Sequence, residues 1–337
     1  MNKYFVTFLV PILFLSCNNI NRTPPIDLSG KEVLLKKASP KIGIAFGGGG
    51  AKAVSHIGIL KVIEEAGIPI NYVAGSSMGA VIGGLYAAGY SAKDIDSLFL
   101  SEEWLSLFDR NELGFTFEYA ERTIFGLIKG DEFQEHLSKV LAQKGCYKIE
   151  DTEKINNIKF CCTATNVIDK EVLEEIDLDS GNMAKAIRAS LTYPAPIVGY
   201  KPVEWNGLSL VDGGMLNNLP VDVVRKIGAK KVIAIDLENP DKGNGELPLS
   251  ISQIRSYIGI TIPIEDILGI KWLVDWLSDH RESNEKRIRN FEDADIKLRP
   301  DLQGYGILSF NEKAFREMID AGEKEASSCY EDIVLLK

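Results

Sequence analysis

The feature that most constrains this 337-residue chain is a pattern of strand, glycine turn and helix that occurs twice near its start. The apolar run 42–46 leads into four consecutive glycines, and helical periodicity follows from 54 to 66. A second apolar run, 70–74, leads into a glycine-flanked turn and then into a helix-forming stretch that ends near Ala88. Strands that alternate with helices build a layered sheet flanked by helices, so we predict an α/β fold.

The same alternation continues toward the C-terminus. Further strands are expected at 159–166, 171–176, 208–212, 232–237 and 295–299. Helices are expected at 91–100, 131–143, 182–190, 220–227, 251–291 and 311–327, with Ser91 and Asn311 as N-caps. Between them, residues 101–128 are rich in aromatic side chains without a clear period, and 243–248 resemble a linker. The body of the chain from Lys41 onward is expected to form one domain.

Composition limits the partners that this chain can bind. Hydrophobic residues make up 45% and charged residues 26% of the sequence, which is typical of a globular protein. The 38 basic and 48 acidic residues give a formal net charge of −10. A nucleic-acid-binding protein carries a basic surface, and so does a protein that docks on anionic lipid through charge alone. We therefore expect no nucleic-acid partner and no purely electrostatic membrane binding.

The N-terminal residues have the character of an export signal. A short basic start at Met1–Lys3 precedes the apolar stretch 4–15, which is shorter than the about 20 residues of a membrane-spanning helix. The run Phe14–Cys17 resembles a bacterial lipobox, which predicts a signal peptide and acylation of Cys17; an ordinary signal peptide with an incidental cysteine is the alternative. Several acyl chains anchor a protein stably. We therefore expect a lipid-anchored protein of the bacterial cell envelope, facing the periplasm or in the outer membrane.

The other cysteines do not have the spacing of metal ligands, and we expect no metal. They are Cys146, Cys161, Cys162 and Cys329. Neighbouring side chains of a strand point to opposite faces, which disfavours a disulfide between the adjacent pair. We expect these cysteines to be buried small hydrophobic residues, although the export signal leaves another pairing open.

The turn Gly75-Ser76-Ser77-Met78-Gly79 has the pattern of a nucleophile elbow. A serine on such a sharp turn between strand and helix needs glycine two residues before and two residues after it, where a Cβ atom would clash. The Ser77 side chain would then stand at a helix N-terminus, where the Met78 amide can stabilise negative charge. A structural Gly–Ser turn is the alternative.

The glycine run Gly47–Gly50 also lies between a strand and a helix, where backbone N–H groups can bind an anion. A P-loop is excluded because its second glycine would fall on Lys52. A dinucleotide-binding fingerprint is nearly met by Gly48, Gly50 and Ala53, but the next strand does not end in a carboxylate for a ribose.

An oxyanion hole is the third interpretation of this run. Amides of Gly48, Gly49 and Gly50 would converge with the Met78 amide over Ser77. We favour this interpretation because the next strand brings the elbow to the same edge of the sheet.

A serine nucleophile also needs a proton acceptor. The chain has three histidines: His56, His136 and His280. The usual hydrolase order leaves His280, but its polar surroundings at 278–285 fit a solvated helix face, and His56 fits local packing. The stronger candidate is Asp212, an acid at a strand end that Gly213 and Gly214 follow. An ordinary turn aspartate is the alternative.

Taken together, these motifs resemble the patatin-like phospholipase family. The resemblance rests on the glycine loop 47–53, the elbow 75–79, and Asp212-Gly213-Gly214 followed by Asn217-Asn218-Leu219-Pro220-Val221. Shorter similarities occur at 56–60, 67–70, 186–190 and 299–302, so the resemblance covers about 41 to 326. It implies a three-layer α/β/α fold with a mainly parallel sheet, a catalytic dyad of Ser77 and Asp212 at the carboxyl edge of its strands, no catalytic histidine, no cofactor and hydrolysis of lipid acyl esters.

One residue departs from the family pattern. The glycine loop of the family has a basic residue followed by glycine, and here Lys52 is followed by Ala53. A methyl group there would restrict the loop if the position needed a positive φ, but it is favourable on a first helical turn. We expect that Ala53 lies on a first helical turn. If the position instead needed a positive φ, the restricted loop would reduce activity.

The expected organisation is a signal peptide at 1–16, a lipidated tether at 17–40, a catalytic domain at 41–240 and a C-terminal helical extension at 241–337 that packs on the same domain. The expected partners are a phospholipid or other lipid ester and a membrane reached through the acyl anchor. The segment with Trp272 and Trp276 has helical spacing, which fits core or homodimer packing or else contact with a membrane or a role as a lid. A catalytically weak lipid-binding or envelope scaffold protein is the second candidate function, and a nucleotide-binding enzyme is the third.

Overall fold

The computed structural model describes residues 41–107, 123–124, 128–168, 172–193, 202–238 and 281–337. All of them belong to one compact unit, Ser39–Lys337. The following predicted features lie outside the described residues: the signal peptide with Cys17, the tether, most of the aromatic segment 101–128, the two tryptophans at 272 and 276, and His280.

A central sheet of eight strands runs through the unit in the order β10-β9-β1-β2-β5-β8-β7, with β6 beside β5. The strands are β1 (Ile42–Phe46), β2 (Ile70–Gly75), β5 (Lys159–Ile168), β6 (Val172–Leu178), β7 (Val203–Trp205), β8 (Leu208–Asp212), β9 (Lys231–Ile235) and β10 (Ile296–Leu298). A separate two-stranded sheet joins β3 (Thr123–Ile124) and β4 (Ile128–Lys129). Neighbours from β10 to β5 are parallel, whereas β6, β8 and β7 run antiparallel to their partners. The predicted α/β fold with a mainly parallel sheet is confirmed.

Helices cover both faces of this sheet. They are η1 (Gly50–Val54), α1 (Ser55–Glu65), α2 (Met78–Ala87), α3 (Ala92–Phe99), α4 (Glu102–Ser106), α5 (Gly130–Gln143), α6 (Asp151–Asn156), α7 (Met183–Leu191), η3 (Gly213–Met215), α8 (Val221–Lys226), α12 (Arg281–Asp293), α13 (Glu312–Ser328) and α14 (Tyr330–Val334). Side chains of Ser91 and Asn311 cap α3 and α13, as predicted. None of the helices in the described segments is long and apolar enough to cross a membrane.

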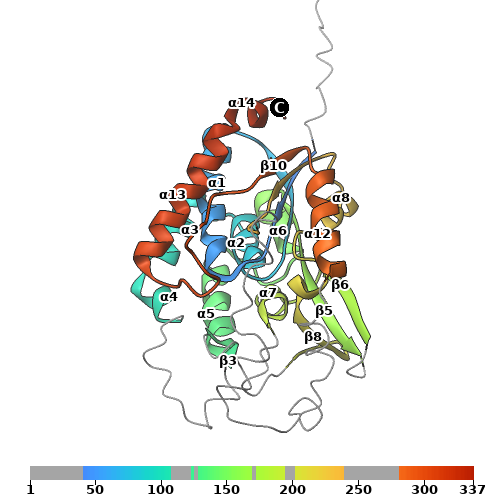
Figure 1. Cartoon of the computed structure of the whole chain (residues 1–337). Helices are drawn as coiled ribbons and strands as arrows, with labels where there is room; N and C mark the ends of the chain where they lie inside the picture. Colours follow the sequence, from blue (N-terminus) through green and yellow to red (C-terminus); the bar gives the residue numbers. More distant parts are fainter. Residues whose placement is uncertain (1–40, 108–122, 125–127, 169–171, 194–201, 239–280) are drawn as a thin grey trace, which may run out of the picture. The chain divides into compact units, whose positions relative to one another are not determined.

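The two faces of the sheet belong to two hydrophobic cores of different character. On one face, large residues such as Ile44 and Phe46 pack with α1, α2 and α13. On the other face, small residues such as Ala45, Ala74 and Cys161 pack against α8 and α12. Figure 1 shows α1 beside α13, with α8 beside α12 across the sheet. Alternation of the strand side chains thus produces three layers.

The four cysteines in the described segments are free thiols. Cys161 and Cys162 are fully buried and contribute to the two different cores, because adjacent residues of β5 point to opposite faces. Cys146 is also buried, and Cys329 is partly exposed. The predicted role as small hydrophobic residues is confirmed for the buried three.

Helices α1 and α13 cross at two glycines, Gly58 and Gly322, with no space for side chains. A Cβ atom on Gly58 would overlap the carbonyl oxygen of Ile319, and one on Gly322 would overlap that of Ser55. This close approach fixes α1, whose N-terminal end continues the glycine loop, against the last long helix of the chain.

Gly322→Ala is therefore expected to destabilise the protein by about 1–3 kcal/mol, even though alanine is the better helix former. Urea denaturation at pH 7 measures this difference. Gly306→Ala is the matched control, since a Cβ atom there would approach no atom closer than 4.0 Å. Equal or higher stability of Gly322→Ala would show that the crossing is looser than the structure indicates.

Candidate active site

Ser77 occupies the sharp turn between β2 and α2 in an unusual backbone conformation. Its φ of 52° and ψ of −129° are rare for a residue with a side chain, and such strain is common at functional turns. A Cβ atom on Gly75 would lie 2.6 Å from the Gly79 carbonyl oxygen, and one on Gly79 would lie 2.5 Å from that of Phe46. The two flanking glycines are thus required by space, which is the reason that the sequence pattern suggested.

The turn is held by a residue for which the sequence predicted no role. The Ser77 N–H donates a hydrogen bond of 3.0 Å to the Oγ of Ser190, which is fully buried at the end of α7. Ser190 belongs to the segment 186–190, which sequence similarity had marked without indicating its function. Its hydroxyl fixes the backbone of the strained serine.

Strand β5 brings Asp212 to Ser77. Cys162 pairs with Gly75 of β2, and Ala164 pairs with Asp212 of β8. Cys162 and Ala164 also pair with β6, which lies along one edge of β5. Both β2 and β8 therefore lie along the other edge of β5. Because β2 is parallel and β8 is antiparallel to β5, their carboxyl ends face each other along that edge, and the elbow meets the aspartate there.

The Ser77 Oγ donates a hydrogen bond of 2.7 Å to Oδ2 of Asp212. The other carboxylate oxygen, Oδ1, accepts the Gly214 N–H at 2.7 Å. Asp212 is only 2% exposed, and its backbone is fixed by bonds with Thr192 and Thr165. Gly213 begins the short helix η3 directly after it. The carboxylate therefore has one fixed orientation, with one oxygen on the serine.

Burial raises the pKa of Asp212 from 3.8 to about 7, and the hydrogen bonds from Ser77 and Gly214 limit this rise. A carboxyl group with this pKa can accept and return a proton near neutral pH. The buried carboxyl group thus has the proton affinity that an ordinary aspartate in water lacks.

The glycine loop, Gly47–Gly50, lies beside the elbow: a Cβ atom on Gly48 would be 3.0 Å from the Ser77 Cβ. The structure differs from the prediction for Gly48, because its N–H donates to the Asn218 carbonyl at 3.1 Å and is not free for an oxyanion. Within the described residues, the N–H groups of Gly49, Gly50 and Met78 have no acceptor. The available donors are therefore those of the second half of the loop and of the elbow.

The residues after the loop support its conformation. Lys52 donates its N–H to the Gly49 carbonyl at 3.2 Å. Ala53 is buried in η1 and has no positive φ, so its methyl group lies on a first helical turn, as expected. The departure from the family glycine leaves the loop unrestricted.

Neither of the two described histidines is hydrogen-bonded to Ser77 or Asp212. His56 is fully buried, and its Nε2 lies 2.8 Å from the Gly47 carbonyl oxygen. Burial lowers the pKa of His56 to about 4, against the smaller raising effect of that hydrogen bond, so the neutral ring donates its Nε2–H to the loop. The Nδ1 of His136 lies 3.0 Å from Oε1 of Glu103. His56 thus packs locally, as predicted, and supports the glycine loop.

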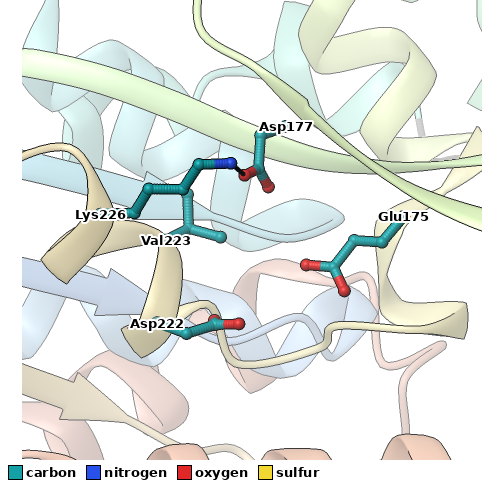
Figure 2. A pocket seen from close by; sticks show the side chains of 5 residues that line it. All are labelled: Glu175, Asp177, Asp222, Val223 and Lys226. Carbon is teal, nitrogen blue, oxygen red and sulfur yellow. Dashed lines mark hydrogen bonds and ion pairs between the residues drawn. The ribbon is translucent and has the colours of Figure 1, made fainter.

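A hollow of about 280 Å³ lies between β6 and α8, apart from the residues around Ser77 and Asp212. Figure 2 shows the side chains that line it: Glu175, Asp177, Asp222, Val223 and Lys226. Lys226 pairs with Asp177 at 2.7 Å, and Lys286 of α12 pairs with Asp222 at 3.0 Å and with Glu175. The charges of the hollow are thus largely balanced within the protein. The described residues contain no group of His, Cys, Asp and Glu side chains that could hold a metal ion.

Known proteins are similar in sequence to parts of this chain. The lysophospholipase NTE1 of Candida albicans is 28% identical over 307 residues, which cover 86% of this chain and 20% of that protein. The patatin-like phospholipase domain-containing protein 6 of Mus musculus is 35% identical over 205 residues, which cover 60% of this chain and 14% of that protein. This chain thus spans a fifth or less of the length of these relatives.

Among solved structures, VipD from Legionella pneumophila superposes with a TM-score of 0.48 at 16% identity, covering 87% of this chain and 67% of that one. A model of the family described as patatin-like phospholipase matches residues 44–225, which include the glycine loop, the elbow and Asp212. The match covers more than half of the chain. This chain therefore belongs to the patatin-like phospholipase family.

Proposed function

We propose that this protein hydrolyses lipid acyl esters, as a phospholipase A or lysophospholipase, with Ser77 as nucleophile and Asp212 as general base. The observation that carries the proposal is the 2.7 Å hydrogen bond from a serine on a strained elbow to a buried carboxylate. The family and the printed names of the relatives, lysophospholipase and patatin-like phospholipase, support the class of substrate.

The first half of the reaction forms an acyl-enzyme. Asp212 accepts the hydroxyl proton of Ser77 while Oγ attacks the ester carbonyl carbon, and the carbonyl oxygen becomes an oxyanion. In this proposal the amides of Gly49, Gly50 and Met78, which have no acceptor within the described residues, stabilise that charge. The tetrahedral intermediate then collapses, and the departing lipid alcohol takes the proton from Asp212.

The second half releases the fatty acid. Asp212 accepts a proton from a water molecule, which attacks the acyl carbon, and the bond to Oγ breaks as Ser77 regains a proton. An acyl chain seated in the site would exclude water and strengthen the electrostatic interactions there. The raised pKa of Asp212 suits both proton transfers, since the group must take up and return a proton in each cycle.

The test is incubation of the purified protein with mixed phospholipids and lysophospholipids, followed by mass spectrometry of the products. We expect release of free fatty acid, together with lysolipids from two-chain substrates, and no release above background by Ser77→Ala. The choice of head group and acyl position follows from which species disappear first. Equal product formation by Ser77→Ala and the wild-type protein would refute the proposal.

The second candidate, a catalytically weak lipid-binding scaffold, rested on Ala53 in the glycine loop. Its position on a helical turn does not restrict the loop and so gives this alternative no support. Covalent labelling of Ser77 by a fluorophosphonate separates the two, because a scaffold without an activated serine would not react.

A further inference from the structure

One side chain, Asn218, connects the aspartate segment with the glycine loop. Its Nδ2 donates to the Gly48 carbonyl oxygen at 3.3 Å and to Oε1 of Glu238 at 3.2 Å. The main-chain carbonyl oxygen of Asn218 accepts the Gly48 N–H at 3.1 Å. An amide nitrogen has two hydrogens, so both are used, and the two peptide groups that flank Gly48 are fixed by the same residue.

The direction of the Gly49 amide follows from this contact. The carbonyl and the N–H of a trans peptide group point in opposite directions, and the described residues contain no cis peptide bond. Asn218 holds the Gly48 carbonyl on its own side, so the Gly49 N–H of the same peptide group points away from Asn218. That N–H has no acceptor within the described residues, and Gly48 lies against Ser77. A donor for the oxyanion is thus oriented by a side chain that does not touch the substrate.

Glu238 fixes which way the Asn218 amide points. If the amide were rotated by half a turn, its oxygen would face both the Gly48 carbonyl and the Glu238 carboxylate, and two hydrogen bonds would become repulsive contacts. The carboxylate is held in turn by Arg287 of α12, whose Nε lies 3.2 Å from Oε2 of Glu238. Arg287 is 5% exposed and also pairs with the buried Asp236 at 2.6 Å.

Helix α12 therefore contributes to a site that lies far from it in the sequence. The family model ends at residue 225, whereas Glu238 and Arg287 come later in the chain. Asn290 of the same helix donates to the Leu219 carbonyl at 2.8 Å and so fixes the segment that carries Asn218. In Figure 1, α12 lies beside α8, which follows this segment directly.

We propose that Asn218 is a positioning residue that orients the Gly49 amide of the oxyanion hole. Glu238 holds Asn218 in its active orientation, and Arg287 of α12 holds Glu238. This inference rests on the proposed function, because an oxyanion hole has a role only if Ser77 attacks an ester. Removal of one oxyanion donor costs about 10²–10³-fold in kcat, and a donor that is misoriented but present costs less.

The experiment compares kcat and KM of p-nitrophenyl ester hydrolysis for full-length wild type, Ser77→Ala, Asn218→Ala and Asn156→Ala. We expect Asn218→Ala to lose about 10–100-fold in kcat with KM within about threefold, since transition-state stabilisation alone is affected. The pH at half-maximal kcat should stay unchanged, because the contact between Ser77 and Asp212 is intact. Asn156 donates an exposed hydrogen bond to Tyr86 on α2, so its alanine variant is the matched control and should retain full activity.

A second pair of variants keeps the test valid if Asn218→Ala folds poorly. Glu238→Gln retains an oxygen that can accept from Asn218, whereas Glu238→Ala does not, so we expect the alanine variant to have at least fivefold lower kcat than the glutamine variant. Melting temperatures are measured for every variant.

The outcomes separate the two hypotheses. A wild-type protein no more active than Ser77→Ala overturns the proposed function, and this inference with it. An active wild type with equal kcat in Asn218→Ala, or a change in KM alone, overturns only the inference. A shifted pH midpoint in Asn218→Ala would also overturn it, because the variant would then have altered Asp212 rather than the glycine loop.

Discussion

Asp212→Asn is expected to lower kcat by about 10³-fold or more while leaving KM near the wild-type value. The asparagine keeps the shape of the side chain and can still accept the Gly214 N–H, so binding of the lipid should change little. What is lost is the proposed proton acceptor, the Asp212 carboxylate oxygen that lies 2.7 Å from the Ser77 Oγ. Removal of the base of a serine hydrolase costs about this much, since the neutral hydroxyl is a poor nucleophile.

Steady-state hydrolysis of a phospholipid and the rate of fluorophosphonate labelling measure this loss independently. Both should fall, because both reactions need the deprotonated Ser77 Oγ. Asp177→Asn is the matched control: Asp177 lines the hollow between β6 and α8 and pairs with Lys226, so its variant should keep wild-type kcat. Rapid labelling of Asp212→Asn would mean that another group activates the serine.

The parallel half of the sheet could be predicted from the sequence because its signals are local. Strands β1 and β2 are short apolar runs followed by glycine turns and periodic helices, and each was placed to within a residue. The elbow could be predicted because its signal is also local: Gly75 and Gly79 flank the serine, and neither position has space for a Cβ atom. Short elements without such signals, β7 and α14 among them, were not predicted.

The meeting of Ser77 with Asp212 depends on long-range pairing that no local pattern encodes. The direction of β8 is set by its pairing with β5, where Asp212 lies opposite Ala164 and Gly75 lies opposite Cys162. The motif at Asp212 could be recognised from the sequence. The antiparallel pairing of β8 with β5, which brings the Asp212 carboxylate to Ser77, could not be predicted. Pairing across almost fifty residues depends on the whole core.

The glycine loop illustrates a different limit. The sequence predicted oxyanion donors at Gly48, Gly49 and Gly50, yet the Gly48 N–H donates to the main-chain carbonyl of Asn218. Which amides are free, and how they are oriented, depends on groups from distant segments: the main-chain carbonyl and the side-chain amide of Asn218, the hydroxyl of Ser190 and, through Glu238, the guanidinium of Arg287. Two of these residues lie in segments that sequence similarity had marked, so the positions were visible but their hydrogen bonds were not.

Asp212 should also make the protein less stable as the pH rises, and Asp212→Asn should remove this dependence. Burial raises the pKa of Asp212 in the folded protein from 3.8 to about 7, so the folded state binds this proton more tightly than the unfolded chain does. The stabilisation is fully present below about pH 4 and is lost as the pH rises to about 7. The loss is on the order of 4 kcal/mol, since each tenfold change in proton affinity corresponds to about 1.4 kcal/mol.

Urea denaturation of the wild type and Asp212→Asn at pH 4.5, 6, 7 and 8 measures this effect. At pH 8 the variant should be the more stable protein, by a few kcal/mol, because it buries no charge. Toward pH 4.5 the difference should shrink. Asp320→Asn, on the exposed face of α13, is the control and should follow the wild type at every pH. Parallel pH curves for wild type and Asp212→Asn would mean that Asp212 ionises in the folded state as readily as in the unfolded chain, and it would then be too weak a base for Ser77 at neutral pH.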